Sequence, residues 1–134
     1  MTIEELLEEA LSVKETAYAP FSNFKVGAIL LTSKGQIYRG CNIEISSYGL
    51  TICAERLAIF KAVSDGERNF ESIFIASDSE KVTPPCGACR QVLWELAGDI
   101  EVFMINRYGE YQQISIRDLL PHGFDKSYLE SGIK

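Results

Sequence analysis

Two cysteines of this chain, Cys86 and Cys89, are separated by two residues at the start of a predicted helix. Side chains three positions apart lie on one face of a helix, so both thiols can reach a single small ion. Zinc binds thiolate sulfur at about 2.3 Å and takes four ligands in total. Redox dithiols and structural zinc sites use the same spacing, so this pair alone leaves the chemistry open.

A third cysteine, Cys53, stands at a second predicted helix start, and Glu55 follows two residues later. Two residues turn a regular helix by roughly 200°, so these side chains converge only if Cys53 is the capping residue. Three thiolates leave the fourth zinc position free for water, which is typical of a catalytic site. Glu55 can then move protons between that water and a substrate.

The charge of such a site needs an offset. Three thiolates around Zn²⁺ carry a net charge of about −1, which weakens the ion as a Lewis acid. Two helix N-termini supply partial charges of roughly +0.5 each, and Arg56 and Arg90 directly follow motif residues. We predict that Arg56 donates hydrogen bonds to the ligand sulfurs, since donors behind the ligands tune a metal. A surface ion pair is the alternative.

The remaining cysteine and the single histidine fall outside this constellation. Cys41 has no ligand spacing, so we expect a buried apolar role for it. His122 follows a proline near the C-terminus, and we expect it to be structural or exposed.

The elements that must position these residues follow from hydrophobic periodicity. Strands are predicted over residues 24–31, 36–41, 73–76, 102–105 and 112–115. Helices are predicted from residue 2 to the break at 18–21, from 51–53 to Gly66, over 86–97 and over 116–120. Helices between strands indicate an α/β protein, and the early hairpin makes the sheet mixed. We predict one domain over residues 1–134, a three-layer α/β/α sandwich around a central mixed five-stranded sheet.

Composition narrows the function. The 134 residues carry a formal charge of −6, which opposes binding of a nucleic-acid backbone. No apolar run approaches the roughly 18 residues that cross a membrane, and the N-terminus is acidic where a secretory signal is basic. We expect a cytoplasmic protein with reduced cysteines, binding neither nucleic acid nor membrane. A chain this short buries about two-thirds of its unfolded surface, which favours oligomerisation.

Four segments together resemble the small, homotetrameric, zinc-dependent cytidine deaminases. They are YAPFSNFKV (18–26), GCNIE (40–44), SYGLTICAER (47–56) and PCGACRQV (85–92). The resemblance runs over about residues 1–124 and keeps the order and spacing of the motifs. It implies hydrolysis of cytidine and deoxycytidine to uridine and deoxyuridine plus ammonia, in pyrimidine salvage.

The resemblance also implies the catalytic roles. Cys53, Cys86 and Cys89 would bind one Zn²⁺ per chain, and zinc-bound hydroxide would attack C4 of the base. Glu55 would be the proton shuttle, taking a proton from the water and passing protons to N3 and to the leaving amine.

Substrate contacts are implied in the same way. Asn42 and Glu44 would bind the ribose hydroxyls, consistent with alternate strand residues facing one way, although a turn network is the alternative. Phe24 would pack on the pyrimidine ring, unless it is plain core. The backbone around Ala54 and Pro85 would read the base edge. Two more residues, Tyr48 and Phe124, match positions that reach into a neighbouring subunit's pocket.

Three rival functions remain open. A deaminase of the same fold could act on another small molecule, such as a nucleoside antibiotic or a modified base. Ile45-Ser46 replaces a frequent Asn-Ala pair, which leaves fine substrate preference and subunit contacts undecided. A polynucleotide-editing deaminase is opposed by the acidic composition. A non-catalytic module stapled by zinc or a disulfide is opposed by Glu55 beside an incomplete ligand set.

Overall fold

The computed structural model describes residues 1–132 and is built around a five-stranded sheet with the order β2-β1-β3-β4-β5. The strands are β1 (Val26–Thr32), β2 (Ile37–Cys41), β3 (Phe70–Ser77), β4 (Glu101–Ile105) and β5 (Tyr111–Ser115). Strands β3 and β4 run parallel, whereas the other three pairs are antiparallel. The predicted mixed sheet is confirmed.

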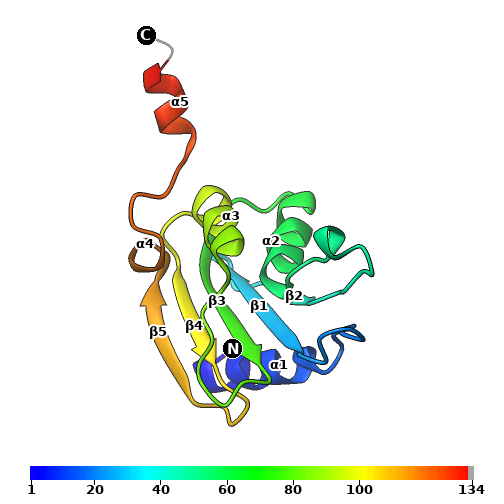
Figure 1. The fold of residues 1–134 in the computed structure, drawn as a ribbon. Helices are drawn as coiled ribbons and strands as arrows, with labels where there is room; N and C mark the ends of the chain where they lie inside the picture. Colours follow the sequence, from blue (N-terminus) through cyan, green and yellow to red (C-terminus); the bar gives the residue numbers. More distant parts are fainter. Residues whose placement is uncertain (133–134) are drawn as a thin grey trace.

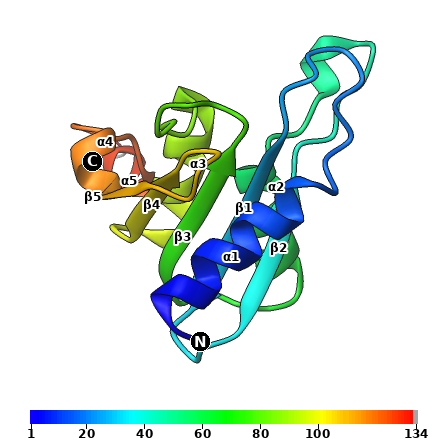
Figure 2. The same ribbon diagram turned by 90° about the horizontal axis from the view of Figure 1, so that it is seen from below.

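Helices cover both faces of this sheet (Figures 1 and 2). Helix α1 (Ile3–Lys14) packs on one face, against β1 and β3. On the other face lie α2 (Ala54–Ser64), which packs on β1 and β2, and α3 (Gly87–Ala97), which packs on α2. These layers confirm the predicted α/β/α sandwich. Short helices α4 (Ile116–Leu119) and α5 (Lys126–Gly132) follow, and α5 projects away from the body (Figure 1).

Helix α1 forms for the reasons that its sequence indicates. The Thr2 hydroxyl accepts a hydrogen bond from the Glu5 backbone N–H at 3.2 Å, and the Glu5 carboxylate reaches back to Thr2, which completes a capping box. Leu6, Ala10 and Val13 repeat at helical spacing and are buried against Ile29 and Phe74 of the sheet. The apolar stripe therefore fixes which face α1 covers.

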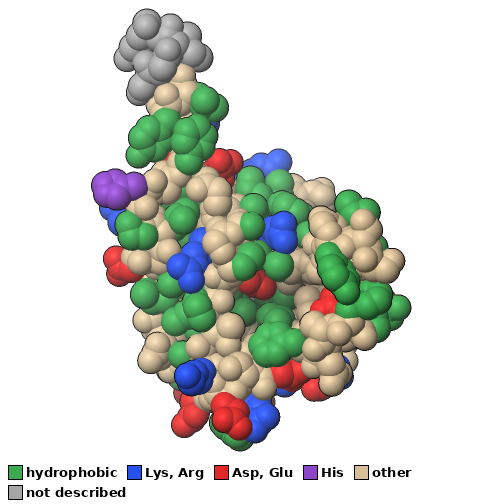
Figure 3. Space-filling model, in the orientation of Figure 1, with side chains coloured by type: hydrophobic (Ala, Val, Ile, Leu, Met, Phe, Trp, Pro, Cys, Tyr) green, Lys and Arg blue, Asp and Glu red, His purple; other side chains and the backbone are tan. Residues whose placement is uncertain are grey.

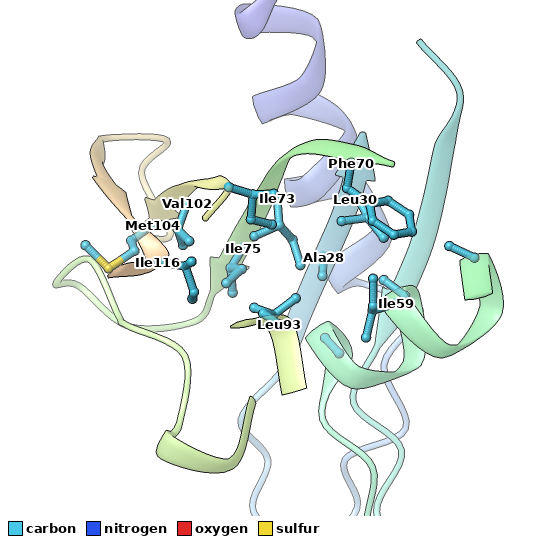
Figure 4. Close-up of a cluster of buried hydrophobic side chains, with 14 residues drawn as sticks. Ala28, Leu30, Ile59, Phe70, Ile73, Ile75, Leu93, Val102, Met104 and Ile116 are labelled. Carbon is cyan, nitrogen blue, oxygen red and sulfur yellow. The ribbon is translucent and has the colours of Figure 1, made fainter. Parts of the chain in front are cut away.

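The larger core lies between the sheet and helices α2 and α3 (Figure 4). Ala28, Leu30 and Ile75 project from the sheet onto Ile59 and Leu93 of the two helices. Close contact at one point sets the position of α2. A Cβ at Gly40 would lie 2.2 Å from the Ala54 carbonyl oxygen, so glycine allows the first turn of α2 to approach β2.

The structure differs from the predicted elements at several boundaries. Strand β1 begins at Val26, so Phe24 lies in the preceding loop and the prediction of strand from residue 24 is wrong. A short 3₁₀ helix (Tyr48–Leu50) and α5 were not predicted. The signal for α5 was Asp125, whose carboxylate accepts the Ser127 N–H at 2.9 Å in the manner of a helix cap. Within residues 1–132, no helix has the length and apolar character needed to span a membrane.

Candidate active site

The candidate site lies where helices α2 and α3 begin. Cys53 is the N-cap of α2 and Cys86 is the N-cap of α3, and both residues have extended backbone conformations. Because a capping residue lies outside the regular helix, the Cys53 side chain can point to the same site as Glu55, although the two residues are only two positions apart. Cys89 lies in the first turn of α3 and is fully buried.

The three sulfurs have the spacing that a zinc ion requires. The Sγ atoms of Cys53 and Cys86 are 3.9 Å apart, those of Cys86 and Cys89 are 3.3 Å apart, and all three lie within 4.8 Å of one another. Tetrahedral zinc with Zn–S distances of about 2.3 Å separates its sulfurs by about 3.8 Å. The donor set therefore fits zinc, and it holds three of the four positions.

Positive charge faces the sulfurs. The Arg56 Nη2 donates to the Cys53 Sγ at 3.2 Å, as predicted from the sequence. The Cys89 thiol and the Arg56 guanidinium lower the pKa of Cys53, whereas the adjacent Cys53 and burial raise the pKa of Cys89. Arg56 Nε is buried and has no hydrogen-bond partner in the described part of the chain. The α2 and α3 N-termini add their dipoles to this field.

Arg90 acts elsewhere. Its Nε donates to the Pro85 carbonyl at 2.8 Å, and its Nη1 donates to the Leu119 carbonyl at 2.9 Å. The guanidinium thus ties the segment before α3 to α4 and orients the Pro85 carbonyl. The preference for Arg56 over Arg90 as the sulfur donor agrees with these contacts.

Glu55 is a buried carboxyl group in the wall of the same cavity. Burial, together with the negative charge on Cys53, raises the pKa of Glu55 to about 7. A carboxyl group with a pKa near neutral pH can both accept and donate a proton at that pH. Perturbed groups of this kind concentrate at catalytic sites.

The cavity has a volume of about 210 Å³. Cys53, Ala54, Glu55 and Cys86 line one part of it, and the other lining residues are Val26, Asn42, Thr51, Ile52, Ile75, Ser77, Thr83 and Pro84. A second pocket, of about 370 Å³, shares Thr51 with the first and is lined by Phe21, Ser22, Glu44 and Tyr48. The two pockets therefore adjoin. Sequence reasoning missed Ser77 and Thr83, which carry no motif and reach the cavity through the fold.

Asn42 and Glu44 hold loop backbone beside the cavity. Asn42 Oδ1 accepts the Val26 N–H at 2.8 Å, and its Nδ2 donates to the Phe24 carbonyl at 2.9 Å. Glu44 Oε1 accepts the N–H groups of Phe21 and Ser22 at 2.9 and 3.0 Å. Hydrogen bonds from the Ser22 hydroxyl and backbone lower the pKa of Glu44. The turn network that was the alternative is present, yet each side chain keeps a free donor or acceptor site.

The three predicted aromatic contacts are exposed to different degrees. Phe24 is 37% exposed, so it belongs to neither core cluster. Tyr48 is 73% exposed, lines the second pocket and packs edge-on against Phe21 at a ring distance of 5.9 Å. Phe124 lies after α4, stacks on Tyr128 and is far along the chain from either pocket. Figure 3 shows hydrophobic side chains gathered over the loops beside α2 and β2.

Cys41 and His122 stay outside the site. Cys41 is half-buried, with its Sγ 3.7 Å from the Thr16 carbonyl oxygen, so full burial was not the outcome. His122 is exposed and adopts a positive φ of 58°, in agreement with the expectation.

Comparisons with known proteins agree on one family. The model of the cytidine and deoxycytidylate deaminase zinc-binding region matches residues 1–105. A cytidine deaminase of Sporosarcina psychrophila is 47% identical over 130 residues, 96% of each chain. Another, of Halalkalibacterium halodurans, is 49% identical over 120 residues, 89% of this chain and 91% of the other. The crystal structure of a cytidine deaminase from Burkholderia pseudomallei superposes with a TM-score of 0.89 at 46% identity, covering 92% of this chain and 100% of that one.

Proposed function

Because the chain belongs to the cytidine and deoxycytidylate deaminase family, we propose that it hydrolyses cytidine and deoxycytidine to uridine and deoxyuridine with release of ammonia. The family and the relatives make it a zinc hydrolase with cytidine deaminase activity. One observation carries the proposed chemistry: three sulfurs lie at zinc spacing, and two of their cysteines, Cys53 and Cys86, line the same cavity as the buried Glu55 carboxyl group.

Cys53, Cys86 and Cys89 would hold the zinc ion as thiolates. Zinc, when bound, supplies a Lewis acid that lowers the pKa of water and so provides a nucleophile at neutral pH. The Arg56 guanidinium, 3.2 Å from Cys53 Sγ, offsets the excess negative charge of three thiolates.

Glu55 would carry every proton of the reaction. It takes a proton from the attacking water and passes it to N3 of the ring, while the water oxygen bonds to C4. It then takes the proton of the new C4 hydroxyl and gives it to the exocyclic amine. The C4–N bond breaks, ammonia leaves, and the product keeps its N3 proton and a C4 carbonyl. A pKa of about 7 suits a group that is base first and acid second.

The nucleoside would lie across the two adjoining pockets. Asn42 and Glu44 would bind the ribose hydroxyls through the donor and acceptor sites that the loop leaves free. Phe24 would pack on the ring, while the backbone of Ala54 and the Arg90-oriented carbonyl of Pro85 would read the base edge. Ala54 lines the zinc-side cavity, which supports this placement.

We also propose a homotetramer with shared active sites. Tyr48, which lines the second pocket, and Leu50 of the same 3₁₀ helix are 73% and 71% exposed, as interface residues are before assembly. The Phe124 backbone is hydrogen-bonded to Gln91 of α3, while its side chain is 49% exposed and so could enter a neighbouring chain's pocket. Cytoplasmic location and a role in pyrimidine salvage complete the proposal, since zinc binding needs reduced thiols and the substrates are free nucleosides.

The first test is turnover with a zinc assay on the same protein. We expect loss of ultraviolet absorbance with cytidine and deoxycytidine, no reaction with adenosine, and about one zinc per chain. Zinc without turnover of either cytosine nucleoside would contradict the proposed substrates and indicate another small molecule. Absence of both zinc and turnover would contradict the site itself.

A further inference from the structure

An ion pair between a buried lysine and a half-buried aspartate lies behind the cavity wall. The Lys14 Nζ, on a side chain only 10% exposed, is 2.9 Å from the Asp78 Oδ1. The other carboxylate oxygen, Asp78 Oδ2, accepts the backbone N–H of Lys25 at 2.8 Å, and the Asp78 N–H donates to the Lys25 carbonyl at 3.2 Å. One aspartate thus joins the end of helix α1, the end of strand β3 and the segment Phe24–Val26.

The segment Phe24–Val26 is held from its other side by Asn42. The Asn42 amide bonds the Phe24 carbonyl and the Val26 N–H, as described above. Asp78 and Asn42 together engage every residue of this three-residue segment. Val26 lines the cavity, and Ser77, which precedes Asp78, lines it too. The ion pair is therefore linked to the cavity wall through the chain neighbours of Val26 and Ser77.

Close packing explains why a lysine is buried at this point. A Cβ at Gly27 would lie 2.4 Å from the Lys14 backbone nitrogen, so the start of β1 presses directly on the last turn of α1. This contact places the Lys14 side chain at the end of the central strands, where it meets Asp78 directly after β3. A buried ammonium is costly unless it is paired, and pairing it restricts the carboxylate to one orientation.

A second ion pair between α1 and the sheet lacks these links. Arg39 Nη2, on β2, is 3.1 Å from the Glu9 Oε2, on α1, and the Arg39 side chain is 50% exposed. Neither residue lines either pocket of the candidate site, and neither is next in the chain to a residue that does. Both pairs join α1 to the sheet, but only the Lys14–Asp78 pair is linked to the cavity wall.

We propose that Lys14 and Asp78 are positioning residues for nucleoside binding. The pair fixes the Lys25 backbone and thereby the neighbouring Phe24 and Val26, of which Val26 lines the cavity. This inference rests on the proposed function, in which Phe24 packs on the pyrimidine ring. Loss of the pair should loosen the wall and weaken binding, while the zinc ligands and Glu55, on α2 and α3, keep their places.

The test compares Lys14→Met and Asp78→Asn with the matched control Arg39→Met, all loaded with zinc. We expect both site variants to raise KM for cytidine about tenfold with kcat within about threefold, and Arg39→Met to leave both within about twofold. Lys14→Arg, which keeps the charge, should recover most of the affinity. Unchanged KM in Lys14→Met and Asp78→Asn, or a fall in kcat at constant KM, would overturn the proposal.

A readout without substrate separates this inference from the proposed function. Amide hydrogen exchange of Lys25 and Val26, measured on zinc-loaded protein well below each melting temperature, should be faster in Lys14→Met than in Arg39→Met. Equal exchange in the two variants would overturn the positioning role. A wild type that binds zinc and leaves cytosine nucleosides unchanged would instead contradict the proposed function, and the exchange result would still stand.

Discussion

The two halves of the candidate site are built by different means. The zinc side uses the first turns of α2 and α3, where Cys53 and Cys86 are caps and the backbone is already fixed by helix and core. The proposed sugar side uses the loops at residues 18–25 and 45–51, which separate hydrogen bonds from side chains and backbone hold in place. Glu44 secures the turn at Phe21 and Ser22.

The difference shows which part of the site can stand alone. Buried apolar packing fixes the positions of the sulfurs and Glu55, so this chain by itself can present the metal ligands. The loops instead expose Phe21 and Tyr48 at the mouth of the second pocket, 50% and 73% respectively. Changes on the zinc side should therefore act mainly on kcat, and changes on the proposed sugar side should act mainly on KM.

The largest effect is expected at Glu55, because no other carboxyl group lines the zinc-side cavity among the described residues. Glu55→Gln keeps the shape of the side chain and removes the group that carries the protons. We expect kcat for cytidine to fall about 10⁴-fold, with about one zinc per chain retained. Steady-state kinetics and metal analysis on the same sample measure both quantities.

The thermal stability of this variant is a second readout. Burial holds the Glu55 carboxyl at a raised pKa, so a neutral amide in its place should leave the melting temperature near that of the wild type. Activity within about tenfold of the wild type would rule out Glu55 as the proton carrier.

Gly40→Ala should have the next largest effect, through the scaffold. The new Cβ would lie 2.2 Å from the Ala54 carbonyl oxygen, so the start of α2 must move away from β2. Overpacking of this kind costs about 2–3 kcal/mol of unfolding free energy. Urea denaturation measures this loss, and the zinc content should fall as Cys53 moves.

Gly49→Ala is the matched control for stability, because nothing lies within 4 Å of a Cβ at that position. Its unfolding free energy should stay within about 0.5 kcal/mol of the wild type. If the two alanine variants unfold at the same urea concentration, close packing at Gly40 does not anchor the zinc side.

The zinc side could largely be predicted from the sequence. The cysteine spacing, the capping positions and the apolar stripes are local patterns, and they place Cys53, Glu55 and Cys86 at helix starts. The existence of the strands could be predicted equally well, because short apolar runs between turns indicate strands whichever strand each one pairs with. The start of β1 was misplaced because Phe24 is apolar without being buried.

For the proposed sugar side, only family resemblance indicated the roles of Asn42 and Glu44, and these roles stay predictions. Its hydrogen bonds join residues far apart in the chain: Asn42 to Val26, Glu44 to Phe21, and Lys14 to Asp78, 64 positions away. No local pattern encodes such pairs, because each depends on strand pairing and on how closely α1 approaches β1. The sequence did not indicate that Lys14 is buried either, because a basic residue in the last turn of a helix is ordinary.

Glu44→Gln should have the smallest of these effects and should act on affinity. The amide keeps one acceptor oxygen for the Phe21 and Ser22 N–H groups and loses the second oxygen, which accepts the Ser22 hydroxyl. We expect KM for cytidine to rise about tenfold with kcat nearly unchanged, as for loss of a contact made equally in ground and transition states. Steady-state kinetics over a range of cytidine concentrations separates the two constants.

Ser22→Ala separates sugar binding from support of the loop, because it removes the same hydrogen bond, together with the bond from the Phe24 N–H to the Ser22 hydroxyl, and leaves the Glu44 carboxylate in place. If Glu44 binds a ribose hydroxyl, Glu44→Gln must raise KM by clearly more than Ser22→Ala does. Equal increases would mean that Glu44 acts through the loop alone. In that case Glu44 would support the loop without touching the ribose. The proposed sugar side would then differ from the packed catalytic half in how it is held, but not through a ribose contact at Glu44.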